Sequence, residues 1–251
     1  TSLSSIAVKN LKYFVDNDVE LGLHWDKFPN ELFFRKKSSY DLSRQKRLLK
    51  TKVMSSRMHF LKWGNHYTNT FRLLVNNGME VDSTYGINFG KGYAFSTSYF
   101  FHPIDTNGNL MPILELPFEV MEKRGNADLD YIEKLIADNN EKYSGVICFN
   151  FHPSEYNSSR HSRARILELA SRSNIIILSL REFYDFYKKR LESSIKTEGS
   201  KIIINAKTKL DLLIPPNFKQ ITLDDKKIKP NKIRGNLFIS INPGKHIIKK
   251  R

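Results

Sequence analysis

The chain has 251 residues, of which 40% are hydrophobic and 27% are charged. This length and composition are typical of a globular protein with one large domain, or with a large and a small domain. The single cysteine, Cys148, excludes an internal disulfide bond and a cysteine-rich zinc module, and its apolar neighbours predict a buried structural thiol. No stretch approaches the roughly 18 consecutive apolar residues of a membrane-spanning helix.

A basic excess is the most unusual feature of the composition. Forty-one Lys and Arg residues against 26 Asp and Glu residues give a formal net charge of +15. Such a charge attracts anionic partners, whether nucleic acid, an anionic polymer or a membrane surface. The alternative is a solvated basic face without a partner. Nucleic acid is the least favoured partner, because the sequence has neither a recognised binding module nor a basic-aromatic sheet pattern.

Helices and strands are expected to alternate over the first three-quarters of the chain. Capping residues and apolar periodicity predict helices over residues 5–16, 42–53, 65–77, 127–140, 160–172 and 180–194. Short apolar runs between them predict strands over residues 19–24, 58–61, 80–82, 113–121, 145–151 and 175–180. This alternation is typical of a parallel sheet with helices outside it.

The pattern changes close to residue 196. Short strands are predicted over residues 201–205, 210–214, 220–223 and 237–241, and Pro, Gly and Asp residues separate them. We therefore expect an α/β domain over residues 1–195 and a small antiparallel β module over residues 196–251. The basic tail, residues 246–251, is expected to fray.

Three predicted strand ends carry groups that can do chemistry: His24, the turn Asp82-Ser83-Thr84, and His152. The carboxyl ends of parallel strands meet at one edge, so these groups are expected to face one cleft. Two imidazoles and a carboxylate suit a hydrolytic zinc ion that keeps a position open for water. The alternative is that each histidine makes only a structural hydrogen bond.

Five segments, in this order along the chain, resemble the polysaccharide deacetylases of carbohydrate esterase family 4, also called NodB-homology enzymes. They cover residues 20–24, 56–61, 78–86, 92–95 and 114–117. The resemblance spans roughly residues 1–190 and is greatest to the subgroup of surface-polysaccharide proteins. It implies a distorted (β/α) barrel whose first strands lie before Thr1. It also implies removal of N-acetyl groups from amino sugars of a polysaccharide or oligosaccharide, with a divalent metal, zinc above all, as cofactor.

The resemblance also assigns roles to individual residues. His24 matches the first metal-binding histidine, and Asp26 is a candidate oxygen ligand in place of the family's second histidine, which falls at Phe28. Arg57 matches the arginine that orients the catalytic carboxylate. Asp82 matches the acidic position of the next motif.

The remaining candidates are a histidine and three aromatic residues. The resemblance makes His152 the general acid, although Asn150 stands where the family has an apolar residue. Trp63, His59 and Tyr93 are candidates for a sugar-binding subsite, because aromatic rings stack on the apolar faces of pyranoses. Ordinary core packing is the alternative interpretation of each ring.

The sequence lacks one motif that the resemblance leads us to expect before His24. The family has an Asp-Asp pair ahead of the first metal histidine, whereas the pair in this chain, Asp224-Asp225, lies in the β module. Either the chain begins inside the domain or the motif has been lost. Two hypotheses follow: a metal-dependent, deacetylase-like hydrolase, and a catalytically inactive relative that binds carbohydrate or has a structural role.

Overall fold

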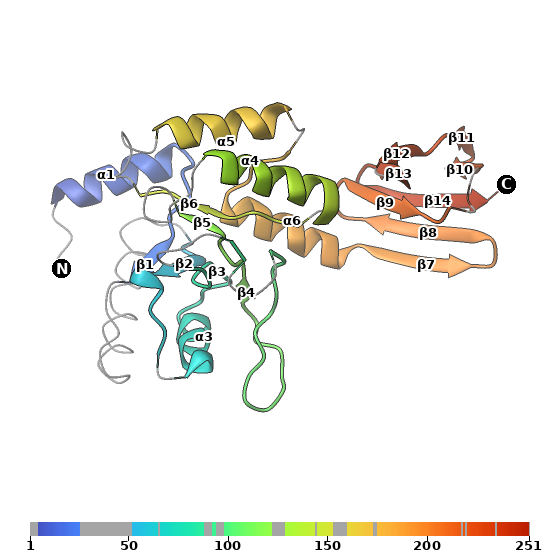
Figure 1. The fold of residues 1–251 in the computed structure, drawn as a ribbon. Helices are drawn as coiled ribbons and strands as arrows, with labels where there is room; N and C mark the ends of the chain where they lie inside the picture. Colours follow the sequence, from blue (N-terminus) through green and yellow to red (C-terminus); the bar gives the residue numbers. More distant parts are fainter. Residues whose placement is uncertain are drawn as a thin grey trace. The chain divides into compact units, whose positions relative to one another are not determined.

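The computed structural model describes residues 5–25, 52–64, 66–87, 92–93, 98–121, 129–143, 145–152, 160–172, 175–216, 218, 220–233 and 235–250 (Figure 1). The chain divides into two compact units, Thr1–Arg181 and Glu182–Arg251. Each unit is described by itself. No helix in the described ranges is both long enough and apolar enough to cross a membrane.

Unit 1 contains a four-stranded parallel sheet in the order β1-β2-β3-β4. Its strands are short: β1 (Leu23–Trp25), β2 (Ser55–Met58), β3 (Val81–Asp82) and β4 (Leu114–Glu115). The register places His24 beside Arg57 and Asp82 beside Glu115. The predicted parallel arrangement of these strands is confirmed, and their carboxyl ends lie at one edge.

A second parallel pair joins β5 (Val120–Met121) to β6 (Phe149–Asn150). The apolar run at residues 113–121 is therefore two short strands in two sheets rather than one long strand. Pro117 lies between them and has no N–H to donate to a ladder, which explains the interruption. Because the described parallel strands form two separate sheets, the closed barrel stays a prediction.

The described helices of unit 1 are α1 (Ser5–Asp16), α3 (Tyr67–Asn76), α4 (Leu129–Asp138) and α5 (Arg160–Arg172). Of these, α3, α4 and α5 contribute residues to the core clusters. Phe71 and Leu74 of α3 pack in one core cluster with Leu23 of β1. The cap of α3 is His66, whose side chain accepts from Thr68 N–H.

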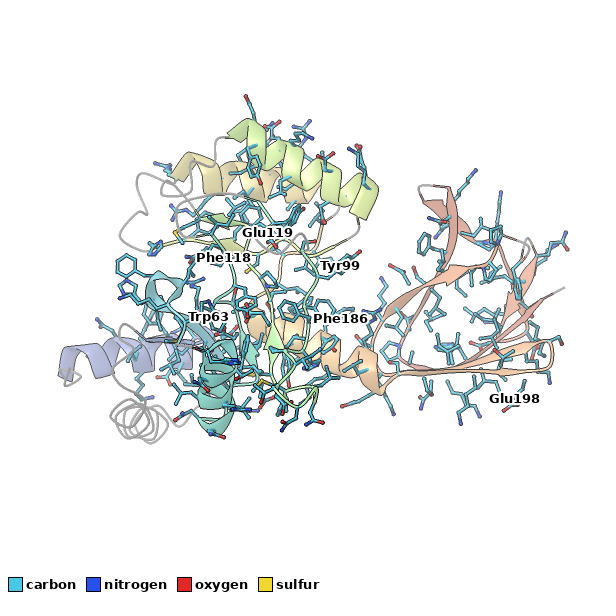
Figure 2. The ribbon with its side chains drawn as sticks, turned by 60° about the horizontal axis from the view of Figure 1, so that its bottom comes forward. Trp63, Tyr99, Phe118, Glu119, Phe186 and Glu198 are labelled. Carbon is cyan, nitrogen blue, oxygen red and sulfur yellow. The ribbon has the colours of Figure 1, made fainter. Side chains whose placement is uncertain are left out.

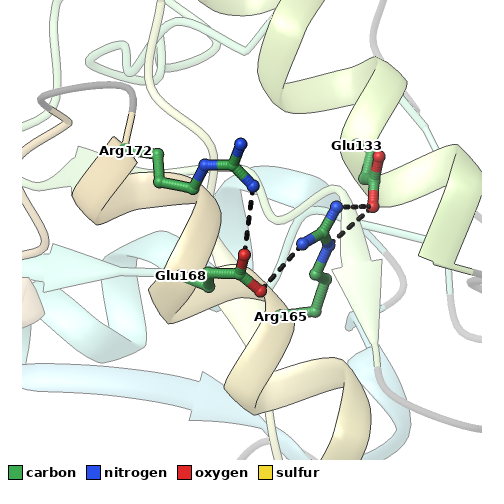
Figure 3. A network of polar contacts seen from close by, with 4 residues as sticks. All are labelled: Glu133, Arg165, Glu168 and Arg172. Carbon is green, nitrogen blue, oxygen red and sulfur yellow. Dashed lines mark hydrogen bonds and ion pairs between the residues drawn. The ribbon is translucent and has the colours of Figure 1, made fainter.

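A second core cluster lies where α4 and α5 pack against β5. It contains Val120, Ile132, Leu135, Ile136 and Ile166. An ion-pair network joins the two helices at the surface (Figure 3). The Arg165 guanidinium lies 2.5 Å from Glu133 Oε1 and 2.8 Å from Glu168 Oε2, and Arg172 binds the other oxygen of Glu168 at 3.1 Å. A π-helical turn, η3 (Asn139–Tyr143), follows α4.

Unit 2 begins in α6 (Leu180–Glu192) and continues as an antiparallel β module. Its larger sheet has the order β11-β10-β14-β8-β7, and its smaller sheet the order β12-β13-β9. Apolar residues of both sheets form one core, with Ile204, Ile214, Ile221, Ile239 and Ile248 at its centre. The strands are β7 (Ser194–Glu198), β8 (Lys201–Ala206), β9 (Leu210–Ile214), β10 (Ile221–Leu223), β11 (Lys226–Ile228), β12 (Asn231–Ile233), β13 (Asn236–Ile241) and β14 (Gly244–Lys250).

The prediction that the chain forms antiparallel strands after residue 196 is confirmed. The basic tail, however, is not frayed. β14 pairs with β8 on one side and with β10 on the other, so it is the middle strand of its sheet. Ile248 is 1% exposed in the core. Pairing on both sides and burial of this side chain hold the tail in place, and the expectation of fraying is wrong.

The predicted strand at residues 175–180 is also wrong. Residues 175–179 have no regular structure, and α6 starts at Leu180. Ile175 N–H donates to the carbonyl of Ala170 at the end of α5, and Ile176 is 80% exposed. A strand needs a neighbour for its backbone groups, and here an apolar, β-branched run lacks one among the described strands.

Candidate functional site

A small pocket lies at the carboxyl ends of β1 and β2 and beside β6. Its empty space is about 270 Å³ when space open to solvent is counted, and its interior has room for only about one water molecule. The lining combines imidazole, guanidinium, amide and apolar groups, from His24, Arg57, Met58, His59, Phe60, Leu61, Met121, Asn150 and His152. The structure therefore brings together His24, Arg57 and His152, three of the residues expected at one cleft, and adds His59.

His24 is held by a hydrogen bond to the backbone of the neighbouring strand. Its Nδ1 lies 2.9 Å from the carbonyl oxygen of Arg57, so Nδ1 carries the hydrogen and Nε2 is left as the basic nitrogen. Burial lowers the pKa of His24, and the nearby Arg57, His59 and His152 lower it further, although the bond to the Arg57 carbonyl opposes them. His24 is therefore a neutral imidazole at neutral pH.

His59 and its neighbours form the rim of the pocket. A 3₁₀ turn, η1 (His59–Leu61), follows β2 directly, so the strand predicted over residues 58–61 is wrong beyond Met58. The His59 ring lies edge-on to the His24 ring, with centroids 5.0 Å apart. Phe60 and Leu61 have φ angles of 53° and 52°, a left-handed conformation that costs energy for residues other than glycine. This turn places the Phe60 ring at the surface, 44% exposed.

Asp82 is not among the residues that line the pocket. Its carboxylate is fully buried, where it accepts from Ser56 Oγ at 2.5 Å and from Thr84 N–H at 3.1 Å. Glu115, on the neighbouring strand, is equally buried and accepts from Tyr85 N–H at 2.8 Å. Burial raises the pKa of Asp82, and that of Glu115 rises well above its ordinary value through burial and the adjacent Asp82 charge.

A third buried carboxyl group belongs to Glu119, labelled in Figure 2. Burial raises the pKa of Glu119 to about 8, even though its Oε2 accepts from Cys148 N–H at 2.8 Å. Burial also raises the pKa of the Cys148 thiol to about 11, and its sulfur lies 3.4 Å from Ser83 Oγ. The thiol is protonated at neutral pH, as expected of a structural cysteine rather than a nucleophile.

Two proposed sugar-binding residues lie in packed clusters instead of the pocket. The Trp63 ring contacts Phe71 and Tyr85, with centroids 5.1 and 4.4 Å away (Figure 2). Tyr93 packs against the cluster that contains Val120. Asp26 lies outside the described residues. As functional assignments, all of these stay predictions.

Sequence reasoning missed several polar residues of this region. Asn150 lines the pocket, is 3% exposed and has a side-chain oxygen without a hydrogen-bond partner among the described residues. The sequence did contain a sign of this role, because Asn150 stands where the resemblance leads one to expect an apolar residue. Glu115 and Glu119 had a signal too, because they are charged residues inside an otherwise apolar run.

The zinc hypothesis requires three protein ligands and a water. Within the described part of the chain, no group of three or more His, Cys, Asp or Glu side chains is placed to hold a metal ion. His24 offers one imidazole nitrogen, and the second candidate, Asp26, is not described. The described residues do not make a complete zinc site, so we derive no chemical step through a metal.

Comparisons with known proteins are sparse. No family model matches the sequence, and no curated protein does. Among solved structures, the chain is similar to a protein from Bordetella bronchiseptica that has a provisional description as a polysaccharide deacetylase involved in O-antigen biosynthesis. The two chains are 14% identical, 74% of each is covered, and the TM-score is 0.33. A similarity this distant carries no argument about function.

Proposed function

We propose that unit 1 is a deacetylase-like hydrolase that acts on N-acetylated amino sugars of a polysaccharide or oligosaccharide. The supporting observation is the pocket in which His24, Arg57 and His152 meet. Hydrolysis of an amide needs a base that activates water, a cation near the developing oxyanion, and an acid that protonates the leaving amine. These three side chains are of the types that those roles require.

The lowered pKa of His24 supports its role as the base. A neutral imidazole whose Nδ1 is committed to the Arg57 carbonyl accepts a proton at Nε2. The Arg57 guanidinium would balance charge on the carbonyl oxygen of the acetamide, and His152 would donate the proton to the departing nitrogen. If a divalent metal takes part, at least one of three protein ligands would have to come from residues outside the described ranges, where Asp26 is the candidate.

We place the proposed sugar subsite at His59 and Phe60 rather than at Trp63 and Tyr93. Both rings line the pocket, and the exposed part of the Phe60 ring, which also contacts the His59 ring, would pack against the apolar face of a pyranose. Trp63 and Tyr93 are already packed against core residues.

A second candidate function is carbohydrate binding without catalysis. The observation that favours it is the incomplete set of metal ligands among the described residues. In that case the pocket would hold the acetamido group, and no acetate would be released.

The test is acetate release from N-acetylglucosamine oligomers by the purified full chain, after chelation and again after Zn²⁺ is restored. The hydrolase proposal predicts release that His24→Ala or His152→Ala lowers at least about a hundredfold, the usual contribution of a general acid or base. His246→Ala, in unit 2, is the matched histidine control and should retain full activity. Sugar binding with no acetate release in any condition would instead support the non-catalytic function.

A further inference from the structure

The basic excess is unevenly divided between the two units. Residues 182–251 contain 17 Lys and Arg against 7 Asp and Glu, a net charge of +10. Residues 1–181 contain 24 against 19, a net charge of +5. Unit 2 therefore carries most of the net positive charge and should attract anionic molecules more strongly than unit 1.

The register of the five-stranded sheet gathers lysines on one of its faces. Alternate residues of β8 and β14, such as Ile204 and Ile248, point into the core. Lys245 pairs with Asn205 and Lys249 with Lys201, so these residues occupy the opposite face. By the same register this lysine face consists of Lys196, Lys201, Lys227, Lys245 and Lys249.

Two lysines of this face repel each other on inner strands of the sheet. Lys201 and Lys249 lie directly opposite each other, and like charges in that relation destabilise a sheet. Lysines commonly guard edge strands, but β8 and β14 are inner strands of this sheet. An external anion bound across both strands would remove the repulsion.

Nearby carboxylates offset only part of the charge. Lys249 forms an ion pair with Asp225, and Glu198, labelled in Figure 2, pairs in register with Lys201. No ion pair joins Lys196, Lys227 or Lys245 to a carboxylate in the described part of unit 2. The ammonium groups of Lys196, Lys227 and Lys245 are thus available to an external partner.

We propose that the lysine face binds an anionic polysaccharide that carries carboxylate groups. Ammonium groups on flexible stems are compact point charges that suit carboxylates at varied spacings. Ile203 and Ile247 lie between the lysines, are partly exposed and offer aliphatic surface to sugar rings. Single-stranded nucleic acids are bound on aromatic stacking platforms, and the described residues of this face include no aromatic ring.

The experiment compares binding of the full chain to hyaluronan oligosaccharides, to uncharged N-acetylglucosamine oligomers and to a DNA duplex. One variant combines Lys196→Gln, Lys201→Gln and Lys245→Gln on the lysine face. The matched control combines Lys207→Gln, Lys209→Gln and Lys232→Gln, which removes the same charge from other parts of unit 2. Circular dichroism and thermal unfolding verify that both variants stay folded.

The proposal predicts hyaluronan binding that weakens roughly tenfold or more as salt rises from about 50 to 200 mM. The lysine-face variant should lose about tenfold in affinity at low salt, and the control less than about twofold. Hyaluronan should bind more tightly than the uncharged N-acetylglucosamine oligomers, which separates this charge-dependent binding from sugar binding in unit 1. Equal losses in the two triple variants, salt-independent binding, or tighter binding to the DNA duplex than to hyaluronan would overturn the proposal.

Discussion

The carboxyl groups of Asp82 and Glu115 lie side by side on β3 and β4 and are fully buried. Two ionised carboxylates on paired positions of neighbouring strands repel each other in a buried site, so one of them holds a proton. Glu115 is the group whose pKa rises well above its usual value. We therefore assign the proton to Glu115 and the charge to Asp82, which Ser56 and Thr84 stabilise with their own hydrogen bonds.

This assignment makes Glu115→Gln a mild substitution. The glutamine oxygen can accept from Tyr85 N–H, and its amide carries no charge, like the protonated acid that it replaces. We expect the free energy of unfolding at pH 7 to change by less than about 1 kcal/mol or to rise. Glu115→Ala, the control, should cost about 2–4 kcal/mol, because it leaves a cavity and a buried N–H without a partner. Urea denaturation measures both, and equal losses in the two variants would show that Glu115 is ionised.

The buried Glu119 predicts a pH dependence of stability. Its pKa is about 8 in the folded protein and close to 4.5 in the unfolded chain. Between these values the unfolded chain has lost the proton that the folded protein keeps, so stability falls as pH rises through this window. The slope from this one group is at most about 1.4 kcal/mol per pH unit.

Glu119→Gln isolates this effect from other titrating groups. The variant should resemble the wild type at pH 5 and be more stable by about 1–3 kcal/mol at pH 8. Denaturant unfolding at both values measures the difference. If wild type and variant keep a constant difference across the range, Glu119 is not the buried acid that its environment indicates.

The last strand should be essential to unit 2. Ile248 is buried in the core of unit 2, whereas Ile247 points to the other face of β14. Ile248→Ala should cost about 2–4 kcal/mol and Ile247→Ala less than about 1 kcal/mol. Thermal unfolding and hydrogen exchange of unit 2 report on both variants. Equal, small effects would indicate that the tail is frayed after all.

Much of the fold was predictable because its signals are local. The helix at residues 160–172 and the strand at 210–214 have the predicted bounds, since periodicity and flanking residues define them. The tail and the run at 175–180 were not predictable. Whether an apolar, β-branched segment becomes a strand depends on a neighbour from elsewhere in the chain, which β14 has and Ile176 lacks.

The candidate site was predictable in part for the same reason. His24 and His152 follow predicted strands, and the parallel arrangement brings them to one pocket. The burial of Asp82 was not visible in the sequence, because it depends on the pairing of β3 with β4 and on Ser56 of β2. His59 lies in a turn whose backbone is left-handed at Phe60 and Leu61. The sequence does not predict this turn, because neither residue is of a type that favours the left-handed conformation.

We propose that the pocket lined by His24, His59 and His152 binds an N-acetylated sugar. The most direct measurement is NMR of the imidazole resonances during titration with N-acetylglucosamine oligomers, with histidine variants to assign each signal. When an oligomer binds in the pocket, the resonances of His24, His59 and His152 should shift together. Those of His102 and His246 should stay in place. A saturating titration in which the His24 and His152 signals do not move, or in which only His246 responds, would contradict it.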